Sequence, residues 1–290
     1  MYMKFICYNY LSVYCDYIID YPIETYLKIG IKPLHNYNYL DLSKLKDNDK
    51  VFIKSDFLTF FFTKIFHKIK SKFYLITGAS DIEINNNYKN FLDNPKIIKW
   101  IGCNITIQNH PKICKFLIGF QERERSTNGT ATGNGGDQQI LYECYKNNME
   151  FNKKKNNLFI TYFNNTHSSR NNILNIFKKE SFSNFVIFGK KMSFKDYLYE
   201  LNNYKFVLCP RGNGVDTHRF SEILLMNSIP VLEKNGLSDL YSKFPCIIVD
   251  NFSNVTIDLL NNTTFDNKKY LNFLKYILIE NNIVNSFLDS

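Results

Sequence analysis

Short apolar runs rich in β-branched and aromatic residues alternate with polar segments of helical period along most of the chain. This alternation is typical of α/β folds with parallel sheets. In the first half, the predicted strands are residues 4–8, 50–54, 73–77, 97–100 and 116–118. In the second half, they are residues 158–162, 184–188, 206–209, 229–232 and 246–249, with helices after Ser168 and at residues 193–203 and 217–226. We therefore expect two Rossmann-like α/β halves whose parallel sheets face a cleft, with ligands bound at the carboxyl ends of the strands.

The polar, basic segment 150–157 follows a predicted helix at residues 137–148 and is the expected linker between the halves. The predicted domains are residues 1–152, residues 153–265 and a C-terminal helix within 266–290. That helix carries one apolar stripe and is expected to pack back on the body. The Gly-, Thr- and Asn-rich stretch 126–136 predicts a mobile loop.

The composition changes this picture little. Hydrophobic residues make up 44% and charged residues 22% of the 290, which excludes a disordered, collagen-like or coiled-coil chain. The formal charge of +9 raises the question of an anionic partner such as nucleic acid. However, the lysines are scattered, and the abundance of Asn, Lys, Ile, Tyr and Phe fits AT-rich coding. No stable nucleic-acid partner is expected, although a basic nucleic-acid-binding protein stays an alternative.

Seven cysteines are widely spaced and form no Cys-x-x-Cys pair, so separate, reduced thiols are expected. The longest apolar stretches fall short of the ~20 residues that span a bilayer. The N-terminus has the pattern of a first strand rather than of a signal peptide. Together these features predict a soluble protein of the cytoplasm without a transmembrane segment.

Residues 206–234 carry the clearest chemistry, in the order strand, glycine-rich turn, helix, strand. Gly212 and Gly214 are expected to let the backbone turn tightly and approach a ligand. The helix after them, capped by Asp216 or Thr217, would present N–H groups and a partial positive charge. This arrangement predicts an anion site.

Charged side chains of the same segment support that prediction. Arg211, His218 and Arg219 supply donors of the kind that hold a diphosphate. Glu222 lies three residues after Arg219 on the helix, so both are expected on one face. A carboxylate there can accept the hydroxyls of a ribose. The alternative is an ordinary surface pair between Arg219 and Glu222.

The segment strongly resembles the C-terminal signature of exostosin-like glycosyltransferases. The matching positions are Cys209-Pro210-Arg211-Gly212, Arg219 with Glu222, and Ile229-Pro230-Val231. The first half looks like viral and bacterial relatives of that family through residues 75–81 (LITGASD), Trp100 with Asn104, 110–112 and Ile118-Gly119. The resemblance covers about residues 51–252.

The resemblance implies a GT-B architecture, with a nucleotide sugar held by the C-terminal domain and a carbohydrate or glycoprotein acceptor held by the N-terminal domain. The implied activity is that of a metal-independent hexosyl- or pentosyltransferase that needs no cofactor, with a UDP-sugar as the expected donor. The implied donor-binding residues are Arg211, Gly212, Gly214, Thr217, His218, Arg219 and Glu222. Arg211 and Arg219 would also stabilise the leaving diphosphate. An inactive nucleotide-binding relative is the alternative.

The base for the acceptor hydroxyl is less clearly indicated. Asp81 follows a predicted strand and is the first candidate, before Glu83, Asp16 and His110. The Asp-x-Asp pattern at residues 47–49 precedes a strand and fits a polar turn better than a metal site. Gly212-x-Gly214 with Glu233 imitates a dinucleotide fingerprint, but Thr217 stands at the third glycine position.

Overall fold

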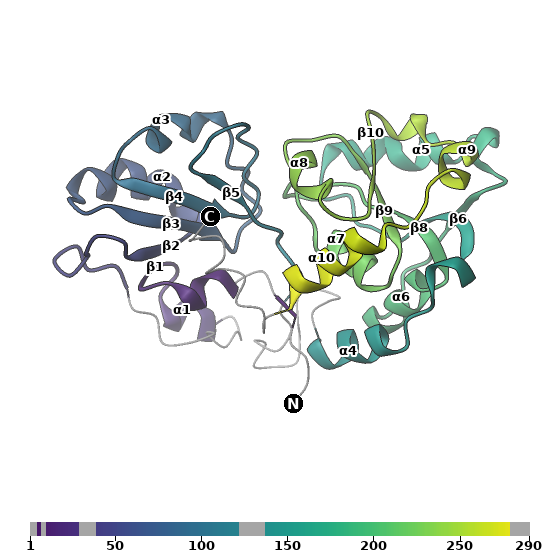
Figure 1. The fold of residues 1–290 in the computed structure, drawn as a ribbon, viewed down its shortest axis with the longest axis horizontal. Helices are drawn as coiled ribbons and strands as arrows, with labels where there is room; N and C mark the ends of the chain where they lie inside the picture. Colours follow the sequence, from purple (N-terminus) through teal and green to yellow (C-terminus); the bar gives the residue numbers. More distant parts are fainter. Residues whose placement is uncertain (1–4, 7–9, 29–38, 122–136, 279–290) are drawn as a thin grey trace.

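The structure, a computed structural model, describes residues 5–6, 10–28, 39–121 and 137–278. It is an α/β fold with two five-stranded sheets, each entirely parallel. Figure 1 shows the sheets in two halves side by side, the first purple to blue and the second teal to yellow. The predicted α/β class and the two parallel sheets are thus confirmed.

The first sheet has the order β1-β2-β3-β4-β5. Its strands are β1 (Tyr17–Ile19), β2 (Lys50–Lys54), β3 (Phe73–Gly78), β4 (Ile97–Gly102) and β5 (Ile113–Lys115). The sequence predicted β2, β3 and β4 correctly and missed β1. The strand predicted at residues 116–118 is wrong, because the sheet ends at Lys115. All three residues are buried, and Phe116 and Leu117 pack in an apolar cluster that includes residues of the second half. Of the strand predicted at residues 4–8, only Phe5 and Ile6 are described, and Phe5 forms a single antiparallel bridge with Leu278.

The second sheet has the order β10-β9-β8-β6-β7. Its strands are β6 (Lys155–Ile160), β7 (Val186–Phe188), β8 (Tyr204–Leu208), β9 (Ile229–Glu233) and β10 (Ile247–Val249), so all five predicted strands are present. β6 begins inside the predicted linker, where Phe151 and Lys154 are buried. The Lys154 ammonium donates to Asn202 Oδ1 and Ser228 Oγ, both at 3.1 Å. Part of the predicted linker therefore belongs to the second half.

Short helices connect the strands. Those of the first half are α1 (Ile23–Lys28), α2 (Leu58–Phe60) and α3 (Lys89–Leu92), with short 3-10 or π segments η1 (Tyr10–Tyr14), η2 (Ser55–Phe57), η3 (Phe61–Ile65), η4 (Phe66–Lys68) and η5 (Asn86–Tyr88). Those of the second half are α4 (Gln138–Lys146), α5 (Ile173–Phe177), α6 (Phe194–Leu201), α7 (His218–Leu225), α8 (Ser238–Tyr241), α9 (Ile257–Asn261) and α10 (Asn267–Ile277), with η6 (Phe151–Lys153), η7 (Ser168–Asn172), η8 (Glu180–Phe182) and η9 (Phe252–Asn254).

Several of these helices begin with a side-chain cap of the kind that their sequences suggest. Asp137 accepts the amides of Gln139 and Ile140 at the start of α4, and Ser193 and Asp266 cap α6 and α10 in the same way. α4 packs against α6 and so lies with the second sheet (Figure 1). The domain boundary at residue 152 stays a prediction. The stretch 126–136 and residues 279–288 of the predicted C-terminal helix lie outside the described residues.

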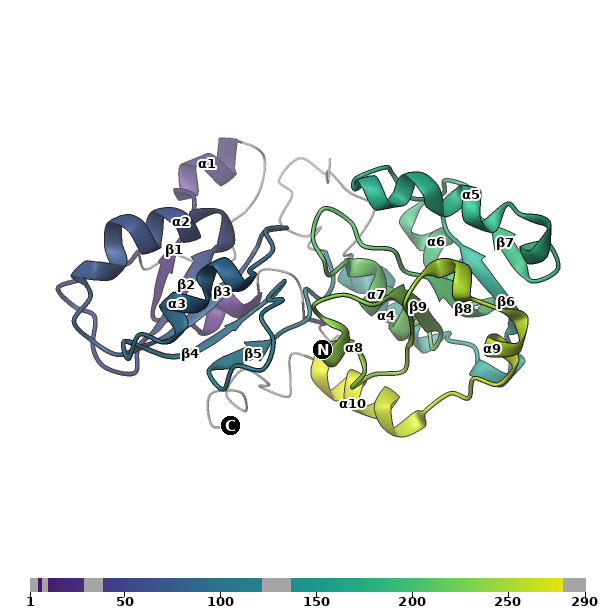
Figure 2. The same cartoon turned by 90° about the horizontal axis from the view of Figure 1, so that it is seen from above.

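One apolar cluster is continuous between the two halves. It contains Phe52 and Ile76 of the first sheet together with Phe159 and Val207 of the second. α10 packs back onto this cluster, since Phe273 is fully buried against it, and in Figure 2 the helix runs along the second half toward the first. Burial of apolar surface on this scale holds the halves together.

Trp100, a member of the family-like pattern, is a core residue. It is fully buried, and its Nε1 donates to Thr77 Oγ1 at 2.9 Å. None of the helices in the described part of the chain is long and apolar enough to cross a membrane. The six described cysteines are free thiols, as predicted.

Candidate functional site

The strand order of the second sheet creates a crevice between β6 and β8. The chain passes from β6 to β7 through α5, whose apolar residues pack on one face of the sheet. It then returns past β6 to β8 through α6, which packs on the opposite face. Where the connections of two neighbouring parallel strands leave in opposite directions, a crevice forms at the carboxyl ends of these strands. Ligands of α/β proteins bind in such a crevice, which is called the topological switch point. The glycine-rich turn that follows β8 lies at this switch point.

Three arginines gather at the switch point, and we call them the arginine cluster: Arg170, Arg211 and Arg219. The whole chain has only five arginines among its 36 basic residues. The Arg170 and Arg219 guanidinium carbons lie 5.2 and 5.8 Å from the centroid of the same ring, that of Phe163. Arg170 Nε donates to the carbonyl oxygen of Arg211 at 2.7 Å. Burial, and then the charge of Arg219, lowers the pKa of Arg170 to about 10, so positive charge is concentrated here.

Several N–H groups of the cluster have no acceptor. Arg219 Nη2 donates to the Tyr162 carbonyl oxygen at 3.2 Å, whereas Nε and Nη1 are buried and have no acceptor within 3.5 Å among the described residues. Tyr197 is near enough to Arg219 to raise its pKa, but it makes no hydrogen bond of ordinary length to these atoms. Arg211 Nε is likewise buried and has no hydrogen-bond partner among the described residues. A buried donor that lacks an acceptor costs about 1–3 kcal/mol, and more when it is charged. An anionic ligand beside either guanidinium would bring oxygen acceptors to it.

Two cavities adjoin the cluster. The first, the Glu222 cavity, has a volume of about 140 Å³ and is lined by Arg219, Glu222, Tyr197, Tyr162, Lys190 and Lys191, among others. The second, the Arg211 cavity, has about 170 Å³ and is lined by Arg211, Thr217 and Glu233, among others. Of the residues that the sequence assigned to one donor site, Arg219 and Glu222 line the first cavity and Arg211 and Thr217 the second, whereas Gly212, Gly214 and His218 line neither.

Glu222 provides the carboxylate of the first cavity. Its side chain is buried, with 7% of the residue exposed, and its Oε2 accepts the hydroxyl hydrogen of Tyr197 at 2.9 Å. Burial raises the pKa of Glu222, and the charge of Arg219 and the Tyr197 hydrogen bond oppose the rise. Arg219 and Glu222 line the same cavity, so they do not form an ordinary pair on a solvated helix face.

The start of α7 differs from the prediction. Thr217 is the residue before the helix, but neither its side chain nor that of Asp216 caps the first turn. The Thr217 hydroxyl lies 3.6 Å from Cys209 Sγ. Asp216 instead joins the two halves, because its Oδ2 accepts the amide of Ile118 at 2.7 Å. Its Oδ1 accepts two hydrogen bonds from within the second half, from the Thr217 amide at 2.8 Å and the Tyr241 hydroxyl at 3.0 Å. Burial raises the pKa of Asp216 to about 6.

The two glycines of the turn have different roles. A Cβ atom at Gly214 would lie 3.1 Å from Asn104 Nδ2, so this glycine allows close packing against the first half rather than against a ligand. Asn104 is fully buried there, and its Oδ1 accepts the amide of Asp216 at 2.8 Å. A Cβ at Gly212 would make only ordinary contacts, the nearest at 3.4 Å to Arg170 Nη2. Gly212 is buried and lines neither cavity, so the structure does not open its backbone to a ligand.

His218 lies at the contact between the halves. Its Nδ1 is 2.9 Å from the Gly119 carbonyl oxygen, which can only accept, so Nδ1 carries the hydrogen. Burial lowers the pKa of His218, and the Gly119 contact and the negative charge of Asp81 oppose this. A neutral ring has its lone pair on Nε2. His218 is therefore a weaker candidate for a cationic diphosphate ligand than the two arginines.

The candidate bases lie in four different surroundings. Asp81 is exposed beyond the carboxyl end of β3, close enough to His218 to act on it through its charge. Glu83 Oε1 accepts the Thr106 hydroxyl at 2.8 Å. Asp16 Oδ2 accepts the amide of Lys50 at the start of β2, the edge opposite the carboxyl ends. His110 lies just before β5, and its Nε2 is 3.3 Å from Asp93 Oδ1.

The structure also shows the surroundings of the Asp-x-Asp pattern and of Glu233, the two motifs considered as alternatives. Asp47 and Asp49 accept the amides of Lys72 and Lys46, as residues of a polar turn do. Within the described residues, no group of three or more His, Cys, Asp or Glu side chains is placed to hold a metal ion. Glu233 faces the Arg211 cavity, and its Oε1 accepts the amide of Phe252 at 3.0 Å.

Sequence reasoning missed Arg170, Tyr197 and the lysines 190 and 191. Arg170 comes 41 positions before Arg211, and only the fold brings the two together. The scarcity of arginine in a lysine-rich chain was the one available signal. No protein-family model matches the chain, and no curated protein matches it significantly.

Proposed function

We propose that the protein is a glycosyltransferase of GT-B architecture that moves a sugar from a nucleotide-diphosphate donor to a carbohydrate or glycoprotein acceptor. The observation that carries the proposal is the pair of buried, unpartnered N–H groups of Arg219 beside the buried carboxylate of Glu222. They lie at the switch point of a parallel sheet, where nucleotides bind in α/β proteins. The resemblance of residues 206–234 to exostosin-like transferases points to the same chemistry.

The donor would occupy the switch point with its diphosphate on the arginine cluster. Guanidinium groups form paired hydrogen bonds with phosphate oxygens, and Arg219 and Arg211 have the N–H donors to do so. Glu222, oriented by Tyr197, would accept the ribose hydroxyls. Tyr162 is 48% exposed and lines the same cavity, so its ring offers a face for the nucleobase.

Sugar transfer breaks the bond between the anomeric carbon and the diphosphate oxygen and forms a bond to an acceptor hydroxyl oxygen. Negative charge grows on the departing diphosphate, and fixed cations at that position lower the barrier. Arg211 and Arg219 would supply these cations at any physiological pH, because guanidinium keeps its proton. The acceptor, held by the first half, would lose its hydroxyl proton to Asp81, whose charge already acts on His218 across the boundary between the halves.

A donor panel tests this proposal. The protein is incubated with UDP-, GDP- and dTDP-sugars, with and without a mixture of oligosaccharide acceptors, and released nucleoside diphosphate is measured. We expect release from one nucleotide class, a loss of release in Arg219→Gln, and no loss in Lys178→Gln, which removes one exposed charge elsewhere. Binding of a nucleotide without release in any mixture would favour the inactive relative. Neither binding nor release would refute the proposal.

A further inference from the structure

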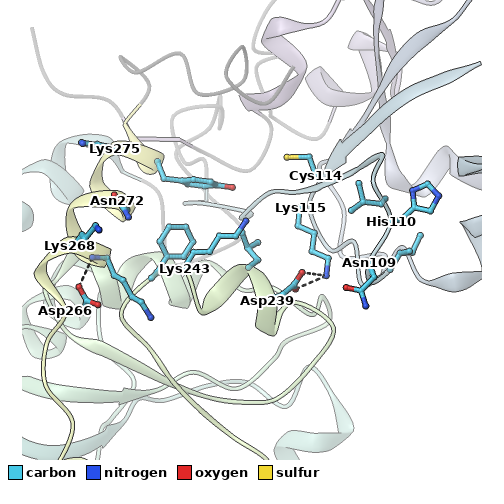
Figure 3. A pocket seen from close by; sticks show the side chains of 16 residues that line it. Asn109, His110, Cys114, Lys115, Asp239, Lys243, Asp266, Lys268, Asn272 and Lys275 are labelled. Carbon is cyan, nitrogen blue, oxygen red and sulfur yellow. Dashed lines mark hydrogen bonds and ion pairs between the residues drawn. The ribbon is translucent and has the colours of Figure 1, made fainter. Parts of the chain in front are cut away.

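A third, larger cavity lies between the halves, and we call it the basic groove. It has a volume of about 980 Å³. Lys115 and His110 of the first half line one side (Figure 3). α8, α10 and the segment after α8 line the other, with Lys243 and Lys268 among their side chains. The groove shares no lining residue with the Glu222 cavity or the Arg211 cavity.

Positive charge is in excess in this groove. Five lysines line it against two aspartates, which leaves three positive charges when His110 is neutral. Both aspartates are already engaged. Asp239 accepts the Lys115 ammonium with its two oxygens at 2.8 and 2.9 Å, and Asp266 Oδ1 caps α10 by accepting the amide of Lys269 at 2.9 Å.

Three of the other lysines that line the groove have no carboxylate partner among the described residues. Lys243, Lys268 and Lys269 form no ion pair with any described residue. Like charges held together at one concave surface repel one another, and the low dielectric of the walls focuses their field. An anion bound in the groove would reduce this repulsion and accept charge-assisted hydrogen bonds from the lysines that reach it.

The ion pair between Lys115 and Asp239 joins the two halves at this groove. Lys115 of β5 donates to Asp239 of α8 and also to the carbonyl oxygen of Gly236 at 2.9 Å. Gln108 Nε2 donates to the same Gly236 oxygen at 2.6 Å. The Lys115 side chain is 7% exposed and that of Asp239 is 53% exposed, so the ion pair is buried on the lysine side and open to solvent on the aspartate side. These contacts hold the two sides of the groove together.

The shape and the lining indicate a compact ligand and not a nucleic acid. The volume lies in the range of roughly 300–1,000 Å³ that is usual for small-molecule sites. Single strands bind through exposed aromatic side chains on which the bases stack. The aromatic residues of this lining, Phe244 and Tyr276, are buried, with 3% and 7% exposed, and cannot act as stacking platforms.

We propose that the basic groove binds a compact polyanion that carries at least two phosphate groups, held by Lys243, Lys268 and Lys269. Such a ligand would lie between the first half and α10, at a site separate from the arginine cluster. The inference does not depend on the proposed glycosyl transfer, because it uses neither the Glu222 cavity nor the Arg211 cavity. The lysines act as mobile point charges, which suits phosphate oxygens in several orientations.

Titration calorimetry with sodium tripolyphosphate tests this proposal. The variant carries Lys243→Gln, Lys268→Gln and Lys269→Gln. The matched control removes three exposed charges of the first half, through Lys64→Gln, Lys68→Gln and Lys70→Gln. Both sets are also made with Arg219→Gln, so that tripolyphosphate bound at the arginine cluster is not counted.

We expect the groove variant to lose affinity for tripolyphosphate by about tenfold or more, and the control to retain it. Affinity in the unaltered groove should fall as salt is raised, since partly exposed charges are screened. Equal affinity in the groove variant and the control would overturn the proposal, as would the absence of binding. A 20-nucleotide single strand that binds the same lysines more tightly than tripolyphosphate would overturn the choice of a compact ligand.

Discussion

Arg170 donates its Nε hydrogen to the carbonyl oxygen of Arg211 at 2.7 Å, so one arginine fixes the backbone that carries another. Its Nη1 donates to the Asn164 carbonyl oxygen at 2.8 Å and its Nη2 to that of Pro210 at 3.3 Å. These bonds join the loop after β6 to the loop after β8 at the switch point. Arg170 is therefore a positioning residue, which holds the two loops in the arrangement that presents Arg211 and Arg219.

Replacement of Arg170 should weaken this arrangement. Arg170→Lys keeps the charge but cannot reach three carbonyl oxygens with a planar fork, so we expect a loss of about 2–4 kcal/mol in the free energy of unfolding. Urea unfolding measures the change. Lys178→Gln, at an exposed position of the same half, is the control and should cost less than about 0.5 kcal/mol. A cost for Arg170→Lys no greater than that of the control would contradict the positioning role.

The two glycines of the turn should respond differently to alanine. Gly214→Ala places a methyl group 3.1 Å from Asn104 Nδ2 and 3.2 Å from the Asp216 carbonyl oxygen, so we expect a loss of about 1–3 kcal/mol. Gly212→Ala meets only ordinary contacts and should leave stability unchanged, or raise it by about 0.4–1 kcal/mol. Thermal unfolding compares the two. If Gly212→Ala were the more destabilising change, the assignment of these roles would be wrong.

Asp216 should make stability depend on pH. Its pKa is about 6 in the folded protein and near 3.8 when unfolded, so between these values the folded state binds more protons. Stability from this group is therefore greatest below about pH 4 and falls as pH rises to about 6, by about 3 kcal/mol. The asparagine in Asp216→Asn cannot ionise, so the variant should not lose this stability. The difference between the free energy of unfolding of the variant and that of the natural chain should therefore rise, in favour of the variant, between about pH 4 and pH 6. Urea unfolding at several pH values measures both, and two parallel curves would show that Asp216 does not titrate as described.

Tyr197 should influence the nucleotide site through Glu222. Tyr197→Phe removes the hydroxyl that donates to Glu222 Oε2 and that lowers the pKa of this carboxyl. The carboxylate would then be harder to ionise, and nucleotide affinity should fall several-fold near pH 6 and less at pH 8. Calorimetric titration with UDP or GDP at both pH values measures this. A loss that is the same at pH 6 and pH 8 would mean that Tyr197 contacts the ligand directly or only supports packing.

The fold was more predictable than the site. Apolar runs such as Phe73–Gly78 lie buried in parallel strands, and local pattern is enough to find them. The run at residues 116–118 misled the prediction because its burial comes from the other half, which no local pattern reveals. Glu222 and Arg219 could be paired from their spacing on one helix. Arg170 and Tyr197 could not, because their contacts join distant elements through the sheet order. Asp216 was assigned to a helix cap because its partner, the amide of Ile118, is 98 positions away.

The central claim is that the arginine cluster and Glu222 form one nucleotide-diphosphate site. Titration calorimetry of pyrophosphate and of UDP, GDP and dTDP tests it most directly, with the natural chain, Arg219→Gln and Glu222→Gln. We predict that Arg219→Gln weakens the binding of pyrophosphate and nucleotide alike by about tenfold or more. Glu222→Gln should weaken only the nucleotide, since pyrophosphate has no ribose. If neither variant changed the affinity for any of these ligands, or if none of them bound the natural chain, the claim would be contradicted.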